Sequence, residues 1–132
     1  MSWQIYVDGA SSGNPGDSGA GMVIFDENGT EISRDSIFLG KMTNNMAEYE
    51  ALLRALEKAQ EHGAQDLVVY TDSLLVANQV IGTYKINNDI LRQYVVKIKN
   101  IISNFDHFAI QYIPREQNKI ADKLAKNGIK KG

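Results

Sequence analysis

Two aspartates occupy equivalent positions at the ends of two apolar segments, where a sheet would present them together. Asp8 follows the alternating segment 3–7, and Asp72 follows the apolar segment 67–71. Because the carboxyl ends of strands form the ligand crevice of open α/β sheets, we expect both carboxylates to converge on one spot. The alternative is that each is a turn or cap residue, since Asp8 precedes a glycine-rich turn and Asp72 precedes a predicted helix.

A third carboxylate lies on the face of a predicted helix that must pack against the sheet. Glu48 comes four residues before Leu52 and eight before Leu56, so the three side chains share one helix face. Burying an uncompensated carboxylate costs several kcal/mol, unless the group is paired or binds a cation. An ion pair with Arg54 is the structural alternative, although Arg54 lies six residues further on and points elsewhere.

A fourth carboxylate, Asp122, lies next to the apolar residues that form the packing face of the last predicted helix. Its alternative is a partly exposed residue paired with Lys126, four positions on. With no cysteine and two histidines in the chain, the four carboxylates form an oxygen-rich site that suits Mg²⁺ or Mn²⁺. Two such ions about 3.5–4 Å apart can activate a water on one side of a phosphodiester and stabilise the leaving oxygen on the other.

Hydrophobic periodicity predicts the elements that position these residues, in the order β-β-β-α-β-α-α-β-α. The strands are predicted at 3–8, 19–26, 31–39, 67–71 and 108–113, and the helices run from the cap at 43–45 to residue 62 and over 73–82, 87–104 and 117–127. The nearly continuous apolar segment 67–71 is typical of a strand that is buried on both faces. We therefore expect a single mixed α/β domain over residues 1–132, with a partly parallel sheet.

Composition limits the class of protein. The chain has 132 residues, of which 43% are hydrophobic and 23% charged, as in a soluble globular domain. Its apolar runs are far shorter than the roughly 20 residues that cross a bilayer, and its start lacks a secretion-signal pattern, so we expect a cytoplasmic protein with no membrane contact. The absence of cysteine excludes disulfides and a cysteine nucleophile.

The formal charge of −2 conceals an uneven distribution along the chain. From Arg115 onward there are six basic residues against two acidic ones, so the C-terminal segment is a candidate contact for a polyanion. The alternative is a solvated helix face with a frayed basic end.

Four short motifs, in this order, resemble those of type 1 ribonuclease H. They are Val7-Asp8-Gly9 with Gly13-Asn14-Pro15-Gly16, Thr43-Asn44-Asn45-Met46-Ala47-Glu48, Tyr70-Thr71-Asp72-Ser73, and Asn118-Lys119-Ile120-Ala121-Asp122-Lys123-Leu124-Ala125. The resemblance covers residues 3–126. It implies a five-stranded sheet in the order 3-2-1-4-5 flanked by helices. It also implies metal-dependent endonucleolytic cleavage of the RNA strand of RNA–DNA hybrids, leaving a 3′-hydroxyl and a 5′-phosphate.

The resemblance also implies a role for individual residues. The catalytic metal ligands would be Asp8, Glu48, Asp72 and Asp122, with Glu48 close to the RNA 2′-hydroxyl that distinguishes RNA from DNA. The substrate contacts would be Asn14 and Thr43 on a phosphate of the DNA strand, and Asn14, Asn44 and Asn45 in the minor groove. Turn and cap formation is the alternative explanation of these polar residues.

The sequence departs from the family pattern in the segment before Asp122. Many members carry a histidine in a flexible loop there, whereas residues 113–118 of this chain are short and contain none. Arg115 in this segment is a candidate substrate contact, with a surface ion pair as its alternative. The basic handle of some members is absent, and Leu74 stands where many have a glutamine that faces the substrate.

These departures leave other functions open. One is a weakly active or inactive module that binds hybrid or double-stranded RNA, and another is a nuclease that also cuts double-stranded RNA. A purely structural domain would not explain a carboxylate on the core-facing stripe at Glu48. We expect the protein to be a monomer.

Overall fold

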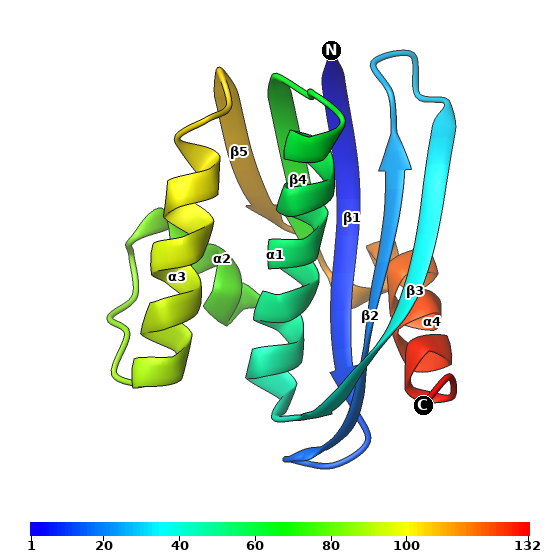
Figure 1. Cartoon of the computed structure of the whole chain (residues 1–132), viewed down its shortest axis with the longest axis vertical. Helices are drawn as coiled ribbons and strands as arrows, with labels where there is room; N and C mark the ends of the chain where they lie inside the picture. Colours follow the sequence, from blue (N-terminus) through cyan, green and yellow to red (C-terminus); the bar gives the residue numbers. More distant parts are fainter.

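Antiparallel strands form one half of the sheet and parallel strands the other (Figure 1). The computed structural model describes residues 1–132. The strands are β1 (Ser2–Ser11), β2 (Gly16–Phe25), β3 (Glu31–Met42), β4 (Asp66–Thr71) and β5 (His107–Tyr112). Their order is β3-β2-β1-β4-β5; β1 pairs antiparallel with β2 and parallel with β4. The expected five-stranded mixed sheet and its order are confirmed.

Helices cover both faces of this sheet. They are α1 (Asn44–Glu61), α2 (Leu74–Ile81), α3 (Asp89–Ile102) and α4 (Lys119–Ile129), and a 3₁₀ turn, η1 (Arg115–Gln117), precedes α4. Helices α1 and α3 lie side by side in front of the sheet in Figure 1, whereas α4 lies behind β2 and β3. Side chains of Thr43, Ser73 and Asn88 accept hydrogen bonds from the first turns of α1, α2 and α3, as N-cap residues do.

The hydrophobic core fills the space between the sheet and the layer of α1 and α3. Leu52 and Leu56 of α1 are fully buried there against Ile5 of β1 and Val69 of β4. The spacing of the helix leucines thus does what the sequence predicted, because it turns one face of α1 towards the sheet.

The expectation that strand 67–71 is buried on both faces is wrong. Leu67 and Val69 are buried, but Val68 and Tyr70 on the other face are only half-buried. The reason is the position of α4, which packs on β2, β3 and β1 and leaves β4 and β5 without a helix on that side. None of the helices is both long and apolar enough to span a membrane.

Two glycines let helices approach the sheet more closely than any other residue would allow. A Cβ on Gly9 of β1 would clash with the backbone of Ala47 in α1, and a Cβ on Gly21 of β2 would clash with the backbone of Ala121 in α4. Because a side chain at either point would displace a helix, these glycines set the distance between the sheet and both helices. Ala47 precedes Glu48 and Ala121 precedes Asp122, so the close approaches bring both carboxylates towards β1.

Candidate metal centre

Asp8 and Asp72 lie at the same edge of the sheet, at adjacent strand ends. Strands β1 and β4 are parallel neighbours with Val7 opposite Thr71, so the aspartates that follow these two residues come side by side. Asp8 lies within β1, which continues to Ser11, and Ser73, rather than Asp72, caps α2. The alternative is therefore wrong for Asp8, whereas Asp72 lies in the bend between β4 and α2 without capping the helix.

Glu48 reaches this edge from α1. It is 8% exposed, and its Oε1 accepts a hydrogen bond of 2.6 Å from the backbone N–H of Gly9. Arg54 instead pairs with Glu50, with 3.1 Å between Nε and Oε2, so the ion pair proposed as the structural alternative does not form. No basic side chain hydrogen-bonds to Glu48, which is held by the end of β1.

The three carboxylates form one cluster. One oxygen each from Asp8, Glu48 and Asp72 lies within 4.8 Å of the others. Asp8 is 3% exposed, and its Oδ2 is buried without a hydrogen-bond partner. Crowded, desolvated oxygens that lack donors are costly unless a cation compensates them, and oxygen ligands suit hard divalent ions. The residues therefore fit a site for Mg²⁺ or Mn²⁺.

Crowding and burial oppose ionisation of the inner two carboxyls. Burial, followed by repulsion from Glu48 and Asp72, raises the pKa of Asp8 far above its usual range. Burial also raises the pKa of Glu48, although hydrogen bonds from Asp8 and the Gly9 N–H oppose the shift. Without a bound cation, burial and crowding therefore favour the protonated forms of Asp8 and Glu48.

Asp122 lies beside the cluster and is held by two cations. Its Oδ1 accepts from Arg115 Nη2 at 3.3 Å, and its Oδ2 lies 3.1 Å from Lys126 Nζ. Partial burial opposes its ionisation, but hydrogen bonds with Lys126 and then Asp8 lower the pKa of Asp122 overall. The pairing with Lys126, which was the alternative, and a position next to Asp8 thus occur together, and the two cations favour the ionised form of Asp122.

A groove of about 470 Å³ opens over the cluster. Its walls include Asn44 at the start of α1, Leu74 at the start of α2, and Arg115 and Lys126 from the C-terminal segment. Leu74 is 49% exposed, so an apolar side chain occupies the position where the family resemblance implies a glutamine facing the substrate.

Of the candidate substrate residues, Asn44 and Arg115 line this groove, and the others lie next to Asn44 in the chain or in space. Asn14 Oδ1 accepts from the Asn44 backbone N–H at 3.0 Å, and Thr43 Oγ1 accepts from the Met46 N–H at 3.2 Å. These bonds are the turn and cap roles of the alternative explanation. Even so, Asn14, Asn44 and Asn45 remain exposed, and their side-chain N–H groups are available to a ligand.

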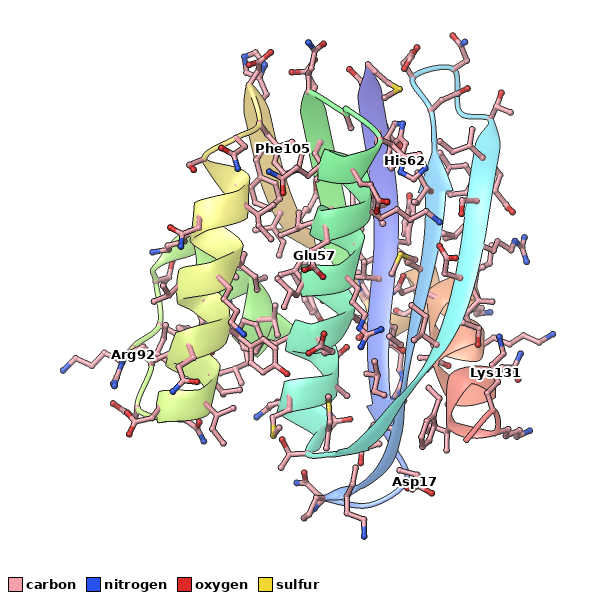
Figure 2. The ribbon with its side chains drawn as sticks, viewed as in Figure 1. Asp17, Glu57, His62, Arg92, Phe105 and Lys131 are labelled. Atoms are coloured by element: carbon pink, nitrogen blue, oxygen red, sulfur yellow. The ribbon has the colours of Figure 1, made fainter.

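The two histidines lie at the opposite end of the sheet. His62 caps the C-terminus of α1, at the upper end of that helix in Figure 2, and His107 begins β5 beside Asp66, with 2.7 Å between Nδ1 and Oδ1. The cluster lies at the lower end, where α1 begins and β1 ends. Neither histidine replaces the one that segment 113–118 lacks.

Asn118 is a member of the site that sequence reasoning missed as a functional residue. It is 1% exposed, and its Nδ2 donates to Val7 O at 2.9 Å and to Asp72 Oδ2 at 3.2 Å. In the sequence it was part of the fourth motif and fell inside the last predicted helix, 117–127. Only the packing of α4 against β1 brings it to the carboxylates, so no local pattern could have indicated the contact.

The order of the sheet and the carboxylates at the ends of β1 and β4 define a ribonuclease H-like protein, and the comparisons agree. The model of a family described as reverse transcriptase-like matches residues 6–128. Ribonuclease HI of Halobacterium salinarum is 38% identical over 124 residues, which cover 94% of this chain and 62% of that protein. Ribonuclease H of Prosthecochloris aestuarii is 32% identical over 142 residues, covering 96% of this chain and 94% of that protein.

Solved structures give the same result. The crystal structure of RNase H1 from Halobacterium salinarum superposes with a TM-score of 0.96, at 36% identity and full coverage of both chains. LC11-RNase H1, solved in complex with an RNA/DNA hybrid, has a TM-score of 0.91 at 40% identity and covers 98% of this chain and 97% of its own. The chain belongs to the reverse transcriptase-like family and, within it, to the type 1 ribonucleases H, as the sequence motifs predicted.

Proposed function

We propose that this chain is a metal-dependent endoribonuclease that hydrolyses the RNA strand of RNA–DNA hybrids, leaving a 3′-hydroxyl and a 5′-phosphate. The observation that carries the proposal is the buried cluster of Asp8, Glu48 and Asp72, with an Asp8 oxygen that has no hydrogen-bond partner. Named ribonuclease H relatives and a neighbour solved with RNA/DNA hybrid support the substrate class. The chain spans 62% of the length of its Halobacterium relative, so the activity is proposed for this domain.

The four carboxylates would hold the cations. Two divalent ions bound there would supply an activated water and charge stabilisation of the leaving oxygen. The N–H of Gly9 keeps Glu48 Oε1 turned towards the end of β1, and the Arg115 and Lys126 cations keep Asp122 ionised, so the ligand oxygens are ready before a cation arrives. Cation binding would favour the ionised forms of Asp8 and Glu48, because the cation compensates their charge.

The rim of the groove would position the hybrid. Asn14, Asn44 and Asn45 offer amides that can hydrogen-bond to groove edges and phosphates, and Thr43 stands at the start of α1, where backbone N–H groups favour an anion. These contacts would fix the register of the hybrid, and the nearness of Glu48 to the RNA 2′-hydroxyl would select the strand.

The direct test is cleavage of end-labelled substrates by the purified chain. Labelled RNA–DNA hybrid, double-stranded RNA and double-stranded DNA are each incubated with Mg²⁺, Mn²⁺ or EDTA. We expect cleavage of the RNA in hybrid with either metal and none in EDTA. The products should carry 5′-phosphate and 3′-hydroxyl ends, which a ligase that requires these ends can join. No cleavage of hybrid by the folded chain in either metal would contradict the proposal.

A second candidate is a weakly active module that binds hybrid or double-stranded RNA. The specific observation in its favour is segment 113–118, which has no histidine and whose Arg115 is bound to Asp122. Tight binding of the chain to hybrid in EDTA, together with a cleavage rate in Mg²⁺ no higher than the background rate, would favour this function over catalysis.

Four expectations accompany the proposal and need their own measurements. They are Mg²⁺ as the cofactor with Mn²⁺ as its alternative, double-stranded RNA as a further partner, a monomeric state and a cytoplasmic location. The substrate panel addresses the first two, and light scattering of the purified chain addresses the third.

A further inference from the structure

The side chain of Asn118 is turned away from the role that its position in the chain offers. Asn118 is the N-cap residue of α4, yet it makes no side-chain capping bond, whereas Thr43, Ser73 and Asn88 cap the other three α-helices. Its backbone still joins the helix, because the Asp122 N–H donates to Asn118 O at 3.0 Å. The side-chain amide of Asn118 therefore lacks the stabilising N-cap hydrogen bond and makes its contacts outside α4.

That contact joins three elements at the carboxylate cluster. Asn118 Nδ2 donates one hydrogen bond of 2.9 Å to the carbonyl of Val7, the residue before Asp8, and another of 3.2 Å to Oδ2 of Asp72. The two N–H groups of one planar amide thereby fix the end of β1 relative to a carboxylate that follows β4. Through its backbone the same residue begins α4, which carries Asp122.

The oxygen of the same amide, Oδ1, indicates that stability alone does not explain the position of the Asn118 side chain. Asn118 is 1% exposed, and its Oδ1 is buried with no hydrogen-bond partner in the protein. A buried acceptor without a donor is unfavourable, so a side chain selected for stability alone would avoid it. The donors of Asn118 are the part of the side chain that the site uses.

We propose that Asn118 is a positioning residue that orients Asp72 and holds the ends of β1 and β4 in register for cation binding. This inference rests on the proposed metal-dependent function. Asp72 has two oxygens, and a donor on Oδ2 restricts rotation of the carboxylate beside Asp8 and Glu48. Without Asn118, the carboxylate must be ordered at the moment of binding, so cation affinity falls while the groove that receives the hybrid stays intact.

The test compares Asn118→Ala with Gln79→Ala in the full chain. Gln79 is the matched control because it is also a buried amide, 5% exposed, with bonds to Tyr49 Oη at 2.6 Å and Lys85 O at 3.3 Å, and it does not touch the carboxylates. The first readout is calorimetric titration with MnCl₂ and with MgCl₂ in the absence of nucleic acid. The second is steady-state hybrid cleavage at several metal concentrations, with the folded fraction measured by circular dichroism.

We expect Asn118→Ala to weaken cation affinity about tenfold to a hundredfold, the usual effect of removing a hydrogen-bond partner of a metal ligand. At low metal, kcat should fall by a similar factor with KM for hybrid within twofold of wild type, and added metal should restore part of the rate. Gln79→Ala should leave cation affinity and kcat within twofold, even with a comparable loss of thermal stability. Asn118→Ser, which keeps a single donor, serves if the alanine variant does not fold, and we expect at least a threefold loss of cation affinity.

Cation affinity of Asn118→Ala equal to that of wild type, or an equal loss in Gln79→Ala, would overturn the positioning role. A wild-type chain that binds cations but does not cleave hybrid would overturn the proposed function alone, since the titration would still decide the role of Asn118. A wild-type chain that binds no divalent cation would overturn both.

Discussion

The backbone N–H of Gly9 donates to Oε1 of Glu48 at 2.6 Å, which ties α1 directly to the end of β1. This bond exists because Gly9 has no Cβ, since a Cβ there would clash with the backbone of Ala47. One position thus serves both as a point of close packing and as the donor that orients a candidate metal ligand.

Gly9→Ala should separate α1 from β1 and break this bond. We expect the free energy of unfolding to fall by about 2 kcal/mol or more, because the clash is with backbone that cannot rotate away. Cleavage should fall more than stability explains, since Glu48 moves with α1. Urea denaturation and kcat of the folded fraction measure the two effects, and a variant as stable and active as wild type would show that the helix and strand are not in contact here.

Asp72→Asn should abolish cleavage and preserve the fold. The substitution keeps the size of the side chain and removes one charge from the cluster. We expect kcat to fall by at least about a hundredfold, because one carboxylate ligand is lost, and melting temperature in EDTA to rise, because crowding of the carboxylates is relieved. Asp17→Asn, on an exposed residue outside the groove, is the control and should change neither. Near-normal cleavage by Asp72→Asn would rule out this assignment of the site.

The stability of the metal-free chain should fall as pH rises. Burial and neighbouring carboxylates raise the pKa of Asp8 above its unfolded value of about 3.9, so the folded chain binds more protons than the unfolded chain above that pH. The stabilisation is complete below the unfolded pKa and is lost as pH rises towards the folded pKa. Melting temperature in EDTA should therefore be lower at pH 8 than at pH 5, after correction for the other groups by comparison with Asp8→Asn, whose profile should be flatter. Parallel profiles for the two proteins would contradict the shift.

The sequence predicted the elements and the carboxylates well because both depend on local spacing. Period-two alternation placed Asp8 on a strand, and helical spacing put Glu48 on the buried face of α1. Two features could not be predicted from the sequence because they depend on how elements distant in the chain pack together. The open face of β4 follows from the position of α4, and Asn118 reaches Asp72 across 46 positions of sequence. Local periodicity contains no information on either contact.

The C-terminal lysines should contribute to hybrid affinity. The end of the chain is not frayed, because α4 continues to Ile129 and Lys131 Nζ donates to Ser36 O at 2.7 Å. Replacing Lys130 and Lys131 with glutamine should raise KM with little change in kcat, and each lost phosphate contact should reduce the salt dependence of binding by about one unit of slope. The same change at the exposed Lys97 and Lys99 on α3 controls for net charge. Equal salt slopes for wild type and the C-terminal variant would show that the tail does not touch the substrate.

Cleavage should not depend on either histidine. His62 and His107 lie at the end of the sheet opposite the carboxylates, so neither can transfer a proton at the cluster. General acid–base assistance by a nearby imidazole is typically worth about 10²–10⁴-fold, and a chain without it should cleave hybrid slowly but measurably. Replacing both histidines with alanine should leave kcat within a few-fold of wild type, once the folded fraction is taken into account. The pH–rate profile of the double variant should also overlay that of wild type. A loss of a hundredfold or more in the folded variant would mean that a histidine reaches the site when hybrid is bound, through a rearrangement of the sheet ends that this structure does not contain.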